Sequence, residues 1–278
     1  MKLKFLNGIV IISILSITTV YSQKIDSIFF AAKAEILLKQ YSMISNSVGK
    51  QKKEAELAFR DSLYKTLQLD DAFYYTFSEI KTIGRISSED EKLVIYTWNI
   101  PQKGGFNNYY GIIQYQAKKN KEIQTYLLKE ASEILTSNQQ SYADISMWPG
   151  ALYYKIVENK YKGQTYYTLL GFHFKDILSN MKLIDILAFN NENTPYFPQK
   201  HFRYAGKTLN RVVFEYNEKV QMTLDYNAGM EMIIFDHLSP SRPSQIDQFQ
   251  FYGPDFSYDG LKFEDGIWMH ESDISVTN

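Results

Sequence analysis

The sequence predicts an α+β protein, in which an N-terminal helical hairpin packs on a large twisted antiparallel β-meander or a partly closed β-barrel. Apolar residues recur at helical spacing over residues 24–69, whereas from about residue 93 they alternate with a period of two. The 22 Tyr, 18 Phe and 3 Trp make up 15% of the chain, and aromatic side chains favour pleated, half-buried surfaces. A small β-propeller-like arrangement is the alternative, because residues 88–92 lead into a strand ending at Trp98, as at the entry to a propeller blade.

The N-terminus has the pattern of a secretory signal peptide over residues 1–22. Lys2 and Lys4 precede an apolar run, and Val20 and Ser22 fill the small-residue positions before cleavage at Gln23. An uncleaved membrane anchor is the alternative, but the run is shorter than the roughly 20 residues of a spanning helix. We therefore expect an exported protein, periplasmic or extracellular, with no transmembrane segment after cleavage.

The chain contains no Cys. This excludes a disulfide framework, thiolate catalysis, Cys-ligated zinc and lipidation at an export-signal cysteine, so we expect a soluble protein without a lipid anchor. Loss of Lys2 and Lys4 lowers the Lys and Arg total from 30 to 28 against 31 Asp and Glu, a net charge near −3. This balance gives no reason to expect nucleic acid as a partner.

Two helices are expected before the β-rich part. The first covers residues 24–44, with Asp26 or Ser27 as its N-cap, and the second covers residues 50–69 after a break at 46–49. In the second helix, Glu56 lies among the polar residues away from the apolar stripe. We assign residues 23–80 to the helical hairpin and residues 81–278 to an antiparallel β-rich domain.

The β-rich part contains runs of strand character and one expected helix. Residues 176–189 suit a helix better than a strand, residues 123–128 fit either, and residues 132–147 look like a long connection. The expected strands are 93–100, 109–116, 151–157, 166–174, 209–216, 220–226, 230–238, 249–252, 261–263 and 267–270.

A stretch near the C-terminus has the spacing of half a calcium loop. Asp255, Ser257 and Asp259 alternate and are followed by Gly260, so their oxygens could converge on one cation. The twelfth loop position is Gly266, where a bidentate Glu would close the site. We therefore expect a tight structural turn over residues 252–260 and no cofactor, with calcium as the alternative.

Other polar and aromatic candidates come without a motif. Asp236 and His237 are the candidate catalytic pair, although neighbours on a strand point to opposite faces unless the strand has ended. A sugar-stacking platform has four candidate residues, for which burial in the core is the competing interpretation: Trp98, Trp148, Tyr109 and Tyr110. The mature chain has no G-x-S-x-G nucleophile elbow and no phosphate-binding loop.

Several segments resemble a group of uncharacterised secreted bacterial proteins. They are residues 97–101 (TWNIP), 166–171 (YYTLLG), 211–216 (RVVFEY), 235–238 (FDHL) and 252–260 (YGPDFSYDG). The resemblance implies an exported bacterial protein and brings no activity or catalytic residue with it.

Two functions are consistent with these observations. The first is a non-enzymatic, exported β-rich protein that binds a protein or glycan of the bacterial envelope. The second is a secreted hydrolase, with or without calcium, acting on glycans or peptides, with a site among Asp236, His237, Asp255 and Asp259. A purely structural envelope component differs from the first only in its partner.

Overall fold

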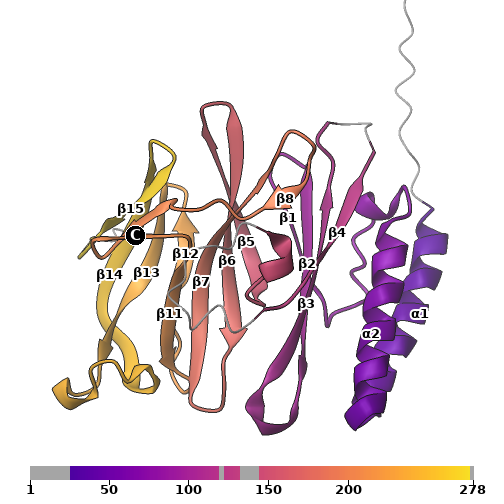
Figure 1. Cartoon of the computed structure of the whole chain (residues 1–278), viewed down its shortest axis with the longest axis horizontal. Helices are drawn as coiled ribbons and strands as arrows, with labels where there is room; N and C mark the ends of the chain where they lie inside the picture. The colour runs from indigo at the N-terminus through magenta and orange to yellow at the C-terminus, as the bar shows by residue number, and fades with distance from the viewer. Residues whose placement is uncertain (1–25, 119–121, 132–143, 276–278) are drawn as a thin grey trace, which may run out of the picture.

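The computed structural model describes residues 26–118, 122–131 and 144–275. The expected signal peptide and most of the connection at 132–147 lie outside these residues. The described chain forms four layers, one of helices and three of β-sheet, which follow one another along the long axis (Figure 1). Each of the three gaps between layers holds one apolar core.

The helical layer consists of α1 (Ser27–Ser45) and α2 (Gly49–Leu67). Asp26 caps α1, accepting a hydrogen bond of 2.9 Å from the Phe29 amide, as its position before the apolar periodicity predicted. The helices bury Leu37 and Phe59, among others, in a core shared with the first sheet. The two expected helices are confirmed, but Glu56 is buried against the sheet rather than facing solvent.

The first sheet has the order β1 (Gly84–Ser87), β2 (Leu93–Pro101), β3 (Asn107–Tyr115) and β4 (Gln124–Leu128). A short 3₁₀ helix, Ala72–Tyr74, precedes it, and another, Lys103–Gly105, lies in the β2–β3 turn. β2 buries both faces: Tyr96 and Trp98 belong to the helix-side core, and Leu93 and Ile95 to the core beyond. Its nearly continuous apolar sequence follows from this position between two layers.

The second sheet has the order β11 (Val212–Asn217), β7 (Ser179–Phe189), β6 (Gln164–Phe174) and β5 (Leu152–Tyr161), with β8 (Pro195–Tyr196) paired to β7. The helix expected over residues 176–189 is wrong, because most of that segment is β7. Leu183 and Leu187 face the first sheet and Ile184 and Ile186 face the third. A strand covered on both faces loses its period of two, which explains the helix-like sequence.

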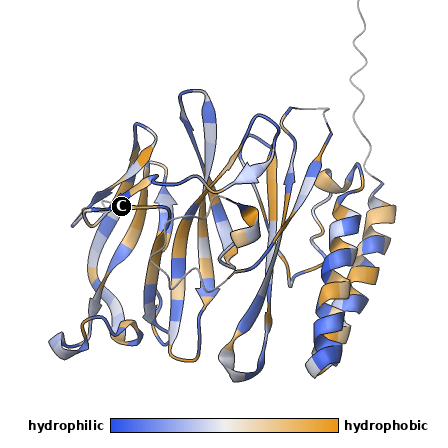
Figure 2. Ribbon diagram, in the orientation of Figure 1, coloured by the Kyte–Doolittle hydropathy of each residue, from blue (hydrophilic) through white to orange (hydrophobic). Residues whose placement is uncertain are grey.

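The third sheet has the order β10 (Lys207–Leu209), β9 (Phe202–Tyr204), β15 (Ile267–Glu271), β14 (Tyr252–Glu264), β13 (Met232–Pro240) and β12 (Leu224–Asn227). β9 and β15 pair in parallel and the other pairs are antiparallel. Trp268, fully buried, donates from its indole to Thr168 of the second sheet at 3.0 Å. Figure 2 shows apolar, orange segments along the strands of the three sheets and on both helices.

The predicted α+β class, a helical hairpin packed on antiparallel β-structure, is confirmed. The sequence predicted a single large sheet or a partly closed barrel, but the described chain forms three open sheets. It does not form the propeller-like arrangement given as the alternative. Strands with two apolar faces, such as β2, β6 and β7, favour stacking of sheets over closure of one sheet. None of the helices in the described part of the chain is long and apolar enough to cross a membrane.

Candidate functional site

The third sheet brings together four of the ionisable residues near the C-terminus. His237 Nδ1 lies 2.9 Å from Asp259 Oδ2, and His270 Nε2 lies 3.3 Å from the same oxygen. The other Asp259 oxygen, Oδ1, accepts from the Asp273 amide at 3.0 Å. Asp255 Oδ2 lies 3.9 Å from His237 Nε2, so the imidazole stands between two carboxylates, one buried and one at the surface.

A β-bulge makes this arrangement possible. The β13–β14 register shifts between Asp236 and Leu238, and His237 therefore leaves the regular alternation of the strand. Asp236 does not join His237, because its carboxylate accepts from the Thr223 amide at 2.5 Å. The predicted Asp236–His237 pair is thus wrong as a pair, and Asp259 is the carboxylate that holds the imidazole.

The cluster shifts the pKa of its members in opposite directions. The hydrogen bond to Asp259 raises the pKa of His237, against a smaller lowering by burial, and the charge of Asp255 adds to the rise. Burial raises the pKa of Asp259, but the hydrogen bonds from His237 and from the Asp273 amide outweigh it, and the pKa of Asp259 lies below its ordinary value. The charged pair is therefore favoured near neutral pH.

We expect this pair to make stability depend on pH. Because the His237 pKa is raised on folding, its contribution is complete below about pH 6.5 and is lost as the pH rises through the raised value. The free energy of unfolding, measured by urea denaturation between about pH 6 and pH 8, should fall across this range. His237→Asn should flatten the fall, whereas an unchanged slope in this variant would contradict the assignment.

The calcium-like segment is an extended strand. The tight turn expected over residues 252–260 is wrong, since β14 covers it and bends at Phe256, whose φ is 72°. Asp255 Oδ1 accepts from the Ser257 amide at 3.1 Å and from its hydroxyl at 2.7 Å. The Asp259 carboxylate instead contacts His237 and His270. No group of three or more His, Asp or Glu residues in the described part of the chain is placed to hold a metal ion.

The four aromatic residues proposed as a sugar platform lie in the cores. Trp98 stacks on Tyr110 with ring centres 5.4 Å apart, and the Trp148 indole donates to the buried Tyr153 hydroxyl at 3.2 Å. Tyr109 stacks on the buried His173, with 4.4 Å between ring centres. Because all four are buried, the competing interpretation, burial in the core, describes them.

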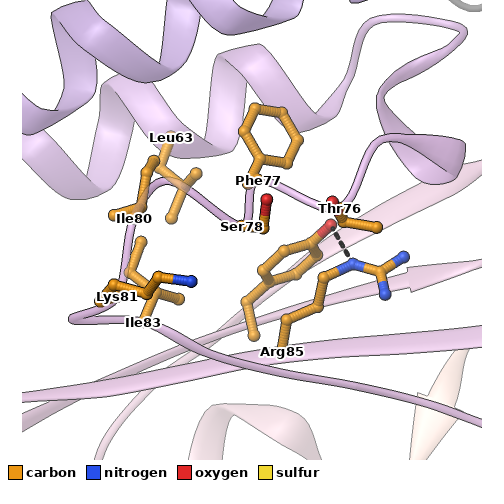
Figure 3. Close-up of a pocket in the computed structure, with 9 residues that line it drawn as sticks. Leu63, Thr76, Phe77, Ser78, Ile80, Lys81, Ile83 and Arg85 are labelled. Carbon is orange, nitrogen blue, oxygen red and sulfur yellow. Dashed lines mark hydrogen bonds between the residues drawn. The ribbon is translucent and has the colours of Figure 1, made fainter.

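A cavity of about 310 Å³ lies between the C-terminal half of α2, the segment that follows it and the first sheet. Figure 3 shows Leu63, Ile80 and Ile83 along one side and Thr76 and Arg85 along the other. The walls are completed by Phe77, Ser78, Lys81 and Tyr96. The cavity combines an apolar floor with hydroxyl groups and two cations, and none of the described residues that line it is Asp or Glu.

Arg85 is the polar centre of this region. Its Nε donates to the Tyr96 hydroxyl at 3.2 Å, and a terminal nitrogen donates to the Phe73 carbonyl at 3.3 Å. Within the described ranges no carboxylate lies within 4 Å of Arg85 or of Lys81, so neither cation has an ion-pair partner there. A half-buried guanidinium with unused donors is suited to bind an anionic group.

Arg85 also lines a second cavity of about 370 Å³, together with Phe73 and Tyr74. Ser87, Asp90, Lys92 and Gln116 line that cavity, which therefore carries both charge signs. Sequence reasoning missed both cavities, because Lys81 and Arg85 belong to no motif. The signal in the sequence was weak: two cations four residues apart, Lys81 just before β1 and Arg85 within it.

No family model and no curated protein matches the chain.

Proposed function

We propose that the protein is an exported, non-enzymatic binding protein of the bacterial envelope, and that the Arg85 cavity is its binding site. The partner is a protein or glycan that presents an acidic group next to an apolar one. The observation that carries this proposal is the lining of the cavity, in which Arg85 and Lys81 meet four apolar side chains without any carboxylate. The export and envelope parts rest on the N-terminal sequence and on the resemblance described above.

The size and chemistry of the cavity support a small ligand group rather than a flat contact. A volume of about 310 Å³ is at the lower limit of small-molecule sites, enough for one residue side chain or one sugar. The guanidinium would pair with the acidic group, and Leu63, Phe77 and Ile80 would contact the apolar part. Both ends of such a ligand are needed, because exposed single charges contribute little to affinity.

The test is a binding series with small carboxylates. N-acetylated amino acids with Ala, Leu or Phe side chains and an acetylated uronic acid would be titrated by NMR chemical-shift perturbation. We expect shifts at residues 76–85 and an affinity about tenfold weaker in Arg85→Gln, because a charged hydrogen bond contributes about 1.5–3 kcal/mol. Arg203→Gln, an exposed arginine of the third sheet, is the matched control. Absence of shifts in this segment for every probe would contradict the proposal.

The hydrolase remains a hypothesis. The buried Asp259 orients His237 as in a histidine–carboxylate general-base pair, and the other imidazole nitrogen, Nε2, lies 3.9 Å from the Asp255 carboxylate. The neighbouring hydroxyl of Ser257 donates to Asp255 and so does not provide His237 with a nucleophile.

A further inference from the structure

Five connections lie side by side at one end of the layered molecule, the lower edge in Figure 1. They are residues 46–53, which include the first turn of α2, and residues 102–106, 175–178, 218–223 and 241–251; together they form what we call the apolar end.

Direct contacts link each connection to the next. Lys52 Nζ donates to the Pro101 carbonyl at 2.5 Å, and a Cβ on Gly105 would lie 2.4 Å from Ile177. The Glu218 amide donates to the Leu178 carbonyl at 3.1 Å. Asn217 Nδ2, just before the fourth connection, donates to the Gln250 carbonyl at 2.5 Å. The connections therefore form one continuous surface that crosses all four layers.

Large apolar side chains project from these connections. Six of them are between 42% and 73% exposed: Val48, Phe106, Ile177, Leu178, Ile246 and Phe249. Each sits at or beside a turn and not in the middle of a strand or helix. The turns of the opposite end, at 88–92, 162–163, 190–194, 228–231 and 265–266, carry no exposed large apolar residue, whereas the helix ends there expose Ile28 and Leu69.

Charge follows the same division. The apolar end contains seven Lys and Arg against three Asp and Glu. The five turns named at the opposite end contain two against six, and the β3–β4 connection there adds three Lys and one Glu over residues 116–122. Three of the lysines are near bordering glutamates, as in the 2.6 Å pair of Lys175 with Glu215. Lys52, Lys103, Lys219 and Arg242 have no carboxylate within 4 Å in the part of the chain that the structure describes.

We propose that the apolar end docks on an anionic lipid surface, with its apolar tips in the headgroup region and its cations at the phosphates. Apolar side chains on separate tips, interspersed with Lys, are typical of interfacial membrane binding. Protein–protein interfaces are instead depleted of Lys, and here six of the seven cations are Lys. The acidic opposite end would face away from the membrane.

The test is vesicle flotation of the chain as processed by the cell, with phosphatidylcholine vesicles with or without phosphatidylglycerol. We expect binding to the anionic vesicles that weakens with salt. Phe106→Ser/Ile177→Ser/Ile246→Ser should lower the partition coefficient about a thousandfold, since each inserted tip contributes about a factor of ten. Lys103→Glu/Lys219→Glu should weaken binding to anionic vesicles alone.

The matched control is Ile36→Ser/Leu38→Ser/Met269→Ser, which removes exposed apolar side chains elsewhere and should leave binding unchanged. In the variant Ile177→Trp, the fluorescence of the introduced tryptophan should be quenched by brominated lipid. Thermal unfolding of each variant verifies that the fold is kept. Equal binding by the tip variant and the control variant, or no binding to either vesicle, would overturn the proposal. A change from dimer to monomer in the tip variant, measured by light scattering, would assign the surface to a second copy instead.

Discussion

Replacing Asp185 with alanine is expected to lower the free energy of unfolding by about 3–5 kcal/mol, because it leaves a cation without its buried partner. Asp185 is 1% exposed and lies between the first and second sheets. Its carboxylate accepts from Arg211 Nε and from the Tyr153 hydroxyl, each at 2.8 Å. Burial, and next the charge of Asp185, raises the pKa of Tyr153 well above its ordinary value, so this hydroxyl keeps its proton and donates.

Urea denaturation followed by tryptophan fluorescence measures this loss. Asp225→Ala is the matched control, because Asp225 also pairs with a cation, Lys155 at 2.6 Å, but its side chain is 61% exposed. That change should cost at most about 1 kcal/mol. The double variant Asp185→Leu/Arg211→Met should recover part of the loss, since it removes both charges together. An equal loss of unfolding free energy in Asp185→Ala and Asp225→Ala would show that the buried ion pair stabilises the fold no more than the exposed one.

The local elements of the fold were predictable where one face of an element meets solvent. The α1 cap at Asp26 and the β2–β3 hairpin follow from helical spacing and from strands joined by a Gly-rich turn. The β7 segment was not predictable in this way, because Leu183 and Ile184 are both buried, on opposite faces. A two-sided strand has no periodic signal, and the number of stacked layers is decided by contacts between distant segments.

The site was less predictable than the fold. His237 and Asp259 are 22 residues apart in the sequence, and only the β13–β14 register and its bulge bring them together. The Arg85 cavity has no motif at all, since its walls come from α2, a connection and two strands. Trp98 and Trp148 show the opposite error: both are residue types that often bind sugars, but here they pack in the apolar cores.

Glu56 shows why a helical pattern alone misplaces a polar residue. Its spacing along α2 indicates the solvent face, but its carboxylate is 1% exposed and points at the first sheet. Oε1 accepts from Gln102 Nε2 at 2.8 Å, and Oε2 accepts from Asn108 Nδ2 at 2.8 Å and from the Tyr110 hydroxyl at 2.7 Å. These three donors offset the cost of burying the charge and fix α2 over the end of the β2–β3 hairpin.

Glu56→Ala is therefore expected to lower the free energy of unfolding by about 3 kcal/mol or more, because one buried and two half-buried donors lose their acceptor at once. Glu54→Ala is the matched control two residues earlier in the same helix: Glu54 is 61% exposed and lies 3.6 Å from Lys50. Its loss should cost less than about 0.5 kcal/mol. Glu56→Gln keeps one acceptor oxygen and should fall between them. Similar urea midpoints for Glu56→Ala and Glu54→Ala would mean that water replaces the carboxylate, and that apolar packing alone holds the helical layer on the sheet.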